Sequence, residues 1–314
     1  MGKSVESLWI NANGTADSDG PSKMAEGIAL QRFAESRLPE DVRIFNDPYA
    51  VHFIDPVKLI WARDHPAETQ AMVEDIEWKM PGWSNAIRGR VRYFDEIVQN
   101  APREGFSQLV ILGAGYDTRA YRIGTLKGHT RVFEIDRPAT QDRKTGIVKK
   151  VFGQLPEYVS FIPYEIGQGL WWPALETAGF SQAKKTLFIL EGLVMYLPRP
   201  DVEGLLTGIA EQAGSGSAVL FDFVPQSLAD GSSDAEGGQN IRESTIRIGE
   251  PIQSGFADDE VVPFLTSIGY SGVQVIPARA FTKMYYTGKN ADRKVSGLLS
   301  IAHARTAGPV GDHP

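Results

Sequence analysis

The sequence predicts an α/β protein built on a mostly parallel, seven-stranded sheet with helices on both faces. Roughly the first hundred residues show helical periodicity. After them, short apolar runs alternate with helical stretches, which is typical of parallel strands joined by covering helices. One of these runs passes into Gly-Ala-Gly within "LVILGAGYDTRAYRI" (residues 109–123). A strand that leads through glycines into a helix brings backbone close to a ligand.

The bulk composition is that of an ordinary globular chain. It has 314 residues, 42% hydrophobic and 23% charged, with a net charge of −7 and no cysteine. The acidic balance makes nucleic acid a poor partner, because phosphate backbones require clustered cations. No apolar run is long enough for a membrane span, and the N-terminus lacks the apolar core of a secretory signal. We therefore expect a cytoplasmic protein without disulfides, thiolate chemistry or a metal.

The N-terminal third is expected to be helical after a disordered stretch over residues 1–20. Apolar residues recur at helical spacing over residues 23–37, and residues 57–80 read as one or two helices. A further helix is predicted over residues 84–100, with Ser84 as its N-cap. Residues 307–314 are expected to be a disordered tail.

Seven strand-like runs follow the helical third. They cover residues 108–115, 130–136, 159–165, 186–192, 217–223, 273–278 and 298–304. The polar, glycine-rich stretch 226–255 breaks this rhythm, so we expect either a mobile lid or a disordered loop there. The lid is favoured because the stretch follows a strand end that faces the pocket.

The glycine turn favours a ligand without phosphate. Gly113 and Gly115 match the first two glycines of a dinucleotide fingerprint, but Thr118 stands where the third should press the helix on the strand. Asp117 would repel a diphosphate and attract an ammonium group. S-adenosylmethionine, with an ammonium, a sulfonium and an adenosine, fits these requirements.

The next strand ends in "FEID", which places Asp136 where an acid would hold ribose hydroxyls. Glu134 is a second candidate on the same side of that strand, one step deeper. The bland alternative is that Gly-x-Gly forms only a tight turn and that Asp136 only caps a helix.

Four motifs in order give the chain a family resemblance. "RFAESR…FNDPYA", "LGAGYDTRAYR", "FEID" and "LFILEGLVMYLP" together resemble the leucine carboxyl methyltransferase family over about residues 22–305. The resemblance implies a class I, Rossmann-like, S-adenosylmethionine-dependent methyltransferase fold. It also implies a helical cap over the cofactor (residues 21–104) and a core (residues 105–306) that carries the lid at about 226–255.

The resemblance also assigns cofactor contacts. It places Gly113, Ala114 and Gly115 under the methionine part of the cofactor and Asp136 on the ribose. In "YEIG", Glu165 and Ile166 would flank the adenine. Glu191 and Arg90 would lie near the amino and carboxylate ends of the methionine, with Arg88 and Arg92 as alternatives to Arg90.

The acceptor is expected to be a small molecule. Members that methylate a protein phosphatase carry a lysine ahead of Arg-Phe-Ala, whereas this chain has Gln31 there. The only histidine in a predicted strand-end motif is His303, which we predict to be a packing residue. A carboxylate needs no base at neutral pH, so the sequence predicts an O-methyltransferase that forms methyl esters. Tyr116, Tyr196 and Arg247 are candidate substrate contacts.

Two alternatives stay open at this point. One is a degenerate fold that binds the cofactor without turnover. The other is a nicotinamide-dependent oxidoreductase, which needs a Tyr-x-x-x-Lys pair; the chain offers only Tyr285 and Lys289. The sequence does not indicate the oligomeric state.

Overall fold

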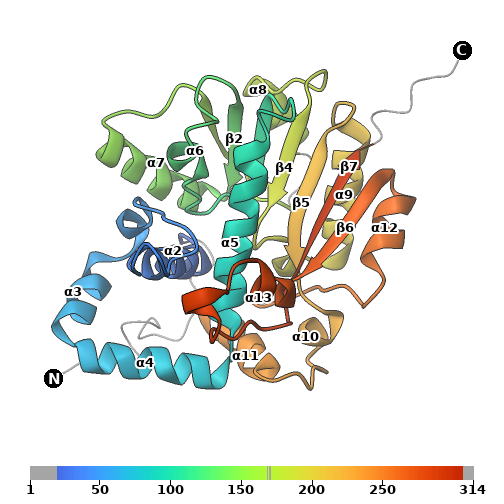
Figure 1. Cartoon of the computed structure of the whole chain (residues 1–314). Coiled ribbons are helices and arrows are strands. Elements are labelled where there is room, and N and C mark those ends of the chain that lie inside the picture. Colours follow the sequence, from blue (N-terminus) through green and yellow to red (C-terminus); the bar gives the residue numbers. More distant parts are fainter. Residues whose placement is uncertain (1–19, 168, 170, 307–314) are drawn as a thin grey trace, which may run out of the picture.

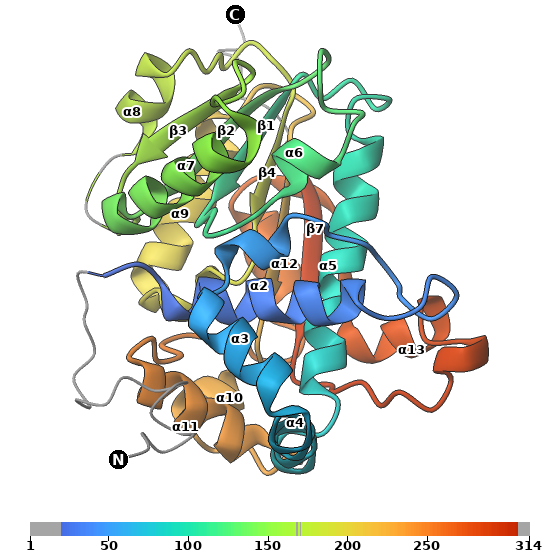
Figure 2. The same cartoon turned by 90° about the vertical axis from the view of Figure 1, so that its left-hand side faces the viewer.

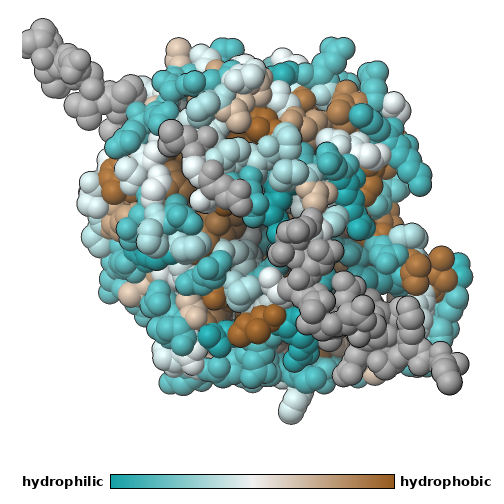
Figure 3. All heavy atoms as spheres, turned by 180° about the vertical axis from the view of Figure 1, so that it is seen from behind, coloured by the Kyte–Doolittle hydropathy of each residue, from teal (hydrophilic) through white to brown (hydrophobic). Residues whose placement is uncertain are grey.

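The computed structural model describes residues 20–167, 169 and 171–306. The predictions for residues 1–19 and 307–314 lie outside this range. In the described part, no helix is both long and apolar enough to cross a bilayer. The face seen from behind is mostly hydrophilic, and its hydrophobic side chains form separate patches (Figure 3).

A single seven-stranded sheet forms the centre of the molecule, as predicted. Its spatial order is β3-β2-β1-β4-β5-β7-β6. Strands β1 to β5 are parallel, and β7 runs antiparallel to both β5 and β6. The strands are β1 (Gln108–Leu112), β2 (Arg131–Asp136), β3 (Val159–Pro163), β4 (Thr186–Leu190), β5 (Ala218–Phe223), β6 (Tyr270–Pro277) and β7 (Ser300–Thr306).

The strand side chains alternate between two hydrophobic cores. Leu109 and Ile111 of β1 join one core, and Val110 and Leu112 join the other. This alternation is the period-two pattern of a strand buried on both faces. The first core is covered mainly by α5 (Trp83–Asn100), α6 (Arg119–Arg122) and α13 (Phe281–Met284). The second is covered by α8 (Trp172–Thr177), α9 (Arg199–Gln212) and α12 (Val261–Ser267).

Helix α7 (Pro138–Phe152) packs on β2 and β3 and shares a smaller third cluster with α2 (Lys23–Ser36). Figures 1 and 2 show α5 running along the sheet and α2 crossing near the carboxyl ends of the strands. Two further helices, α3 (Pro56–Asp64) and α4 (Pro66–Lys79), project beside α2 and have no buried residue. Short 3-10 turns complete the chain: η1 (Ala50–Phe53), η2 (Val194–Tyr196), η3 (Ala278–Ala280) and η4 (Gly288–Asn290).

Two local expectations differ from the structure: the Ser84 N-cap and the disordered-loop alternative for residues 226–255. The Ser84 N-cap is wrong: α5 begins at Trp83, and its N-cap is Gly82 in the left-handed region at φ 72°. Glycine suits this position because its φ is positive and because a Cβ would lie 2.7 Å from the backbone nitrogen of Ser296. Within residues 226–255 the chain forms α10 (Gln226–Asp230) and α11 (Gly238–Ile248) rather than a loop without secondary structure. Helix α11 buries Ile241 and Thr245 on one face, which gives the segment a packed side.

Candidate active site

The carboxyl ends of the parallel strands border a cavity of about 640 Å³. This is the edge where open α/β sheets bind ligands, and the volume is within the usual range for a small-molecule site. The cavity is lined by the turns after β1 to β5, by α2 and α5, and by the end of α11. Predicted residues among the lining are Arg90, Gly113, Ala114, Gly115, Tyr116, Asp136, Glu165, Ile166, Glu191 and Tyr196.

The glycine turn is closely packed on two sides, by Leu193 and by Ala25 of α2. Gly113 and Gly115 have φ values of 65° and 44°. A Cβ on Gly113 would lie 2.9 Å from Leu193 Cδ1, and one on Gly115 would lie 3.2 Å from the Cβ of Ala25 on α2. The turn therefore needs glycine both for its backbone angles and for the close approach of its neighbours.

Asp136 is tied to the glycine turn. Its carboxylate accepts hydrogen bonds from the backbone N–H of Gly115 at 2.5 Å and of Arg137 at 2.7 Å. Burial raises the pKa of Asp136, although both N–H groups favour the ionised form. Glu134, the alternative, is fully buried, pairs with Lys144 at 2.6 Å and does not line the cavity. Strand β2 thus presents Asp136, and not Glu134, to the site.

Arg90 is the arginine of α5 that reaches the cavity. It lies between Glu191, at 3.0 Å, and Asp222 of β5, at 2.6 Å. Arg88 faces Glu35 at 3.5 Å, and Arg92 pairs with Glu96 one helical turn further on. Neither of these two arginines lines the cavity.

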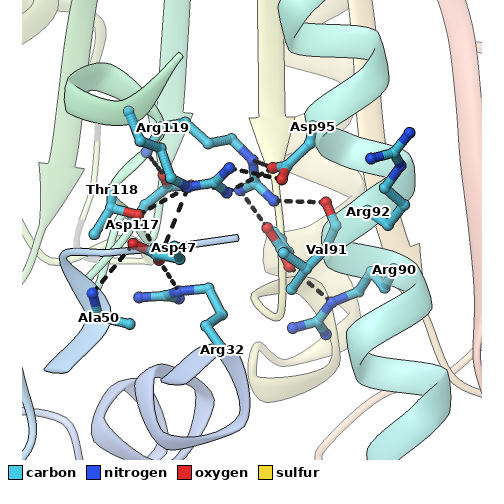
Figure 4. A network of polar contacts seen from close by, with 12 residues as sticks. Arg32, Asp47, Ala50, Arg90, Val91, Arg92, Asp95, Asp117, Thr118 and Arg119 are labelled. Atoms are coloured by element: carbon cyan, nitrogen blue, oxygen red, sulfur yellow. Dashed lines mark hydrogen bonds and ion pairs between the residues drawn. The ribbon is translucent and has the colours of Figure 1, made fainter. Parts of the chain in front are cut away.

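Arg119 on α6 joins the same network and is almost fully buried (Figure 4). Its guanidinium contacts Glu191 at 2.5 Å, Asp117 at 2.5 Å and Asp95 at 2.7 Å. Burial alone would raise the pKa of Glu191, but Arg119 and Arg90 outweigh it and hold that pKa below its usual value. The network therefore keeps charged groups in a buried site by pairing them.

Asp117 is also committed to Arg119. Burial opposes its ionisation, but the attraction of Arg119 and the Arg119 backbone N–H lower the pKa of Asp117 to about 2. The expected free carboxylate beside a ligand ammonium is thus neutralised by a neighbour. Asp95 and Asp222 were not predicted. The only sequence signals were an acid on an apolar helix face and an acid within the apolar run "AVLFDF".

A second buried pair fastens α2 to the glycine turn. Arg32 contacts Asp47 at 2.8 Å and donates a hydrogen bond to the Tyr116 carbonyl at 2.5 Å. Asp47 also accepts hydrogen bonds from Thr118 Oγ1 and the backbone of Ala50 (Figure 4). The motif "RFAESR…FNDPYA" therefore serves to place α2 over the turn.

Of the remaining predicted side chains, Tyr116 and Tyr196 line the cavity, whereas Arg247 and Gln31 do not. Tyr116 is buried against Phe53 with ring centroids 5.1 Å apart, and Tyr196 is half-buried; burial raises the pKa of both phenols. Arg247 is exposed on α11 and is not among the cavity-lining residues, because the inward positions of that helix are Ser244, Thr245 and Ile248. Gln31 accepts a hydrogen bond from Arg88 at 3.1 Å, which joins α2 to α5.

The residues considered for other chemistries lie elsewhere. Tyr285 donates a hydrogen bond to Glu96, and Lys289 pairs with Asp41, so neither reaches the cavity. His303 lies on β7 between Leu220 and Gln274, and burial lowers its pKa. Across the described ranges, no group of three or more Asp, Glu or His side chains is arranged to hold a metal ion.

Comparison with known proteins first defines the class of fold. A crystal structure of a provisionally named methyltransferase from Thermobifida fusca superposes with a TM-score of 0.61 at 12% identity, covering 93% of this chain and 97% of that one. A DUF574 family protein from Streptomyces avermitilis gives a TM-score of 0.59 at 11% identity, covering 93% and 100%. The chain thus has the class I, Rossmann-like methyltransferase fold.

The family follows from sequence. The leucine carboxyl methyltransferase family model matches residues 25–210, and the chain belongs to this family. Proteins provisionally named as S-adenosyl-L-methionine-dependent methyltransferases match from Mycolicibacterium paratuberculosis (32% identity, 67% of each chain) and Streptomyces coelicolor (33%, 68% of this chain and 70% of that one). The chain is an S-adenosyl-L-methionine-dependent methyltransferase, which sets aside the nicotinamide-dependent oxidoreductase.

Proposed function

We propose that this enzyme forms a methyl ester on a carboxylate of a small-molecule acceptor. S-adenosyl-L-methionine supplies a methyl group on a cationic sulfur, which a nucleophile displaces in line. The residues present fit this cofactor. The glycine turn offers backbone with no side chain in the way, and the cavity volume suits an adenosine compound. Asp136 stands beside the turn with carboxylate lone pairs for ribose hydroxyls.

The rest of the cofactor contacts follow the strand order. Glu165 and Ile166 line the cavity after β3, on the far side of Asp136, where the adenine would lie. Glu191, which follows β4, would then bind the ammonium end, and Arg90 beside it would bind the methionine carboxylate. We further propose that residues 21–104 act as the cap and residues 226–255 as the lid of this site, because α2, α5 and α11 all contribute lining residues.

We choose a carboxylate as the nucleophile because the carboxylates in the cavity wall already form ion pairs or hydrogen bonds within the protein. Asp117 and Glu191 are bound to arginines, Glu250 accepts hydrogen bonds from the start of α2, and Asp136 accepts two from the glycine turn and Arg137. Glu165, the remaining carboxylate of the lining, is the one assigned above to the adenine. A group held ionised by a cation is a weak proton acceptor, because protonation would leave the cation unpaired. An acceptor that is already ionised at neutral pH needs no such base, and a carboxylate is one.

The residues of this chain then contribute by positioning the acceptor carboxylate and by excluding water from it. Holding the carboxylate oxygen in line with the methyl carbon can supply on the order of 7–11 kcal/mol. Removing part of the carboxylate's hydration makes it more reactive. The oxygen–carbon bond forms as the carbon–sulfur bond breaks, and no proton moves.

The experiment uses methyl-labelled cofactor and a panel of carboxylic acids, each paired with its primary amide. Turnover with an acid and not with its amide is expected. The product should release labelled methanol in alkali, because methyl esters hydrolyse while methyl ethers and methylamines do not. Alkali-stable label on a phenol or an amine would contradict the proposal. An absence of turnover with every acceptor, despite cofactor binding, would favour the non-catalytic alternative.

A further inference from the structure

We propose that the acceptor carries its methylated group on an extended apolar body, held in the half of the cavity that faces β4, β5 and β7. This inference deepens the proposed function and rests on it only for the identity of the carboxylate. It concerns the non-reacting part of the substrate, which the cofactor contacts do not address.

The sheet order divides the cavity into two halves. The glycine turn, Asp136 and Glu165 follow β1, β2 and β3, which are consecutive neighbours on one side of the sheet. On the other side, Val224 follows β5 and Leu299 precedes β7. Because β7 is antiparallel to β5 and Phe223 is paired with Ser300, these two side chains belong to the same edge of the sheet. With the adenosine in the first half, as proposed above, the second half is left to the acceptor.

The floor of this acceptor half is apolar and buried. Val224 and Leu299 are each 1% exposed, Met195 after β4 is 4% exposed, and Ile252 after α11 is 7% exposed. All four line the cavity, and all four belong to the first of the two hydrophobic cores described above. A polar substrate group set against this floor would lose its hydration without a partner.

Two polar side chains in the acceptor half, Thr245 and Gln253, already form hydrogen bonds within the protein. Thr245 Oγ1 donates to the Arg242 carbonyl and accepts from the Ile252 N–H. Gln253 donates to the Tyr196 carbonyl. What the wall offers to an acceptor is therefore mainly hydrocarbon surface.

Apolar lining continues from the floor to the cavity mouth. Met80 and Trp83, at the turn from α4 to α5, and Ile87 one turn later form one wall. Ile76 of α4 lines the cavity and is 39% exposed, and Val73, on the same face three residues earlier, is 54% exposed. This continuity indicates an acceptor body long enough to reach from the floor to the rim.

Binding to the protein saturated with S-adenosylhomocysteine tests the inference without turnover. Straight-chain carboxylates from four to twelve carbons would be titrated by calorimetry. We expect affinity to rise about fourfold per added methylene, the value for burying one CH₂ group, until the chain leaves the cavity. A flat or falling dependence on length, or tighter binding of a polyhydroxylated acid of equal length, would overturn the inference.

The same series separates this inference from the proposed function. Chain-length-dependent binding with methyl transfer to the acids supports both. If amines or phenols with matching chains bind with the same length dependence and are the ones methylated, the carboxylate proposal fails and the apolar body stands. Methylation of short, polar acids in preference to long ones leaves the proposed function intact and rejects the apolar body.

Two tryptophans provide matched variants. Trp83→Ala should lower the affinity for a ten-carbon acid by roughly tenfold or more, because it removes a large apolar contact, and should leave a four-carbon acid within about twofold. Trp78, on α4, is 79% exposed and does not line the cavity, so Trp78→Ala should change the affinity for neither acid.

Ile76→Ser is a second variant, at a half-exposed site with little risk to folding. It should lower the affinity for the ten-carbon acid by less than Trp83→Ala does. Equal affinities for the long acid in Trp83→Ala, Ile76→Ser and the unaltered protein would count against the inference.

Discussion

Glu250 Oε1 accepts a hydrogen bond from the backbone N–H of Lys23 at 2.9 Å, across 227 positions of sequence. The same oxygen accepts from Met24 at 3.1 Å, and the carboxylate accepts from Ser22 Oγ at 3.0 Å. A carboxylate at a helix N-terminus satisfies N–H groups that have no partner within the helix and interacts favourably with the helix dipole. The segment after α11 is thereby joined to the start of α2 above the cavity.

Removing this contact should loosen the site. We expect Glu250→Ala to weaken S-adenosylhomocysteine binding by roughly 5- to 20-fold, mainly through faster release, since a hydrogen bond to a charged group contributes about 1.5–3 kcal/mol, part of which water would replace. Stopped-flow displacement would measure the dissociation rate. Glu243→Ala, on the exposed face of α11, is the control. A dissociation rate equal in both variants would show that the contact does not restrain the cofactor.

Asp136 is expected to be the main polar contact to the cofactor on the β2 side. Asp136→Ala should weaken S-adenosylhomocysteine binding by about 1–3 kcal/mol, because it removes the ribose contact and frees the Gly115 N–H. Asp136→Asn keeps an acceptor oxygen and should lose less. Calorimetry gives both values, with urea unfolding as a check on stability. Unchanged affinity in Asp136→Ala would refute the ribose assignment, and Glu134 would not replace it, because Lys144 holds it in the core.

The Asp117–Arg119 pair predicts a pH dependence of stability. The pKa of Asp117 is lowered to about 2 in the folded protein and is close to 4 in the unfolded chain. The unfolded state therefore binds the proton first, so the stabilisation is complete above about pH 4 and is lost as pH falls toward 2. The group contributes about 2 kcal/mol. Urea unfolding from pH 5 to 2 should show a steeper loss for the unaltered protein than for Asp117→Asn, and parallel curves would contradict this prediction.

Gly113 and Gly128 separate backbone strain from crowding. Both have positive φ, at 65° and 80°, but a Cβ on Gly128 would meet nothing within 4 Å, while one on Gly113 would press on Leu193. Alanine at either site should cost about 1–2 kcal/mol of folding free energy from the left-handed backbone. Only Gly113→Ala should also weaken cofactor binding, because Leu193 lines the cavity. Cofactor affinity reduced equally in both variants would reject the crowding argument.

Much of the fold could be predicted because its signals are local. Each predicted apolar run contains or overlaps a strand, and residues 23–37 and 57–80 correspond to α2 and to the pair α3 and α4. The glycine turn and Asp136 were also predictable, since glycine is required where backbone angles are positive and the acid ends the next strand. Such features depend on residues a few positions apart.

The network of buried ion pairs around Arg90 could not be predicted from the sequence in the same way. Arg90, Glu191 and Asp222 meet although 101 and 132 positions separate the arginine from its two partners. Arg247 lies in the segment predicted as a lid, but the helix phase of α11 places it outward, away from the cavity. Glu250 carried no signal, because its partners are backbone groups of a distant helix.

By itself the sequence determined the periodicity of the strands and helices, the position of the glycine turn and the family. Only the tertiary structure decided which acids are neutralised, which arginine of α5 faces the cavity and which apolar side chains line it. The physical reason is that pairing and burial depend on distances across the sheet and between helices, which the packing of the whole chain fixes.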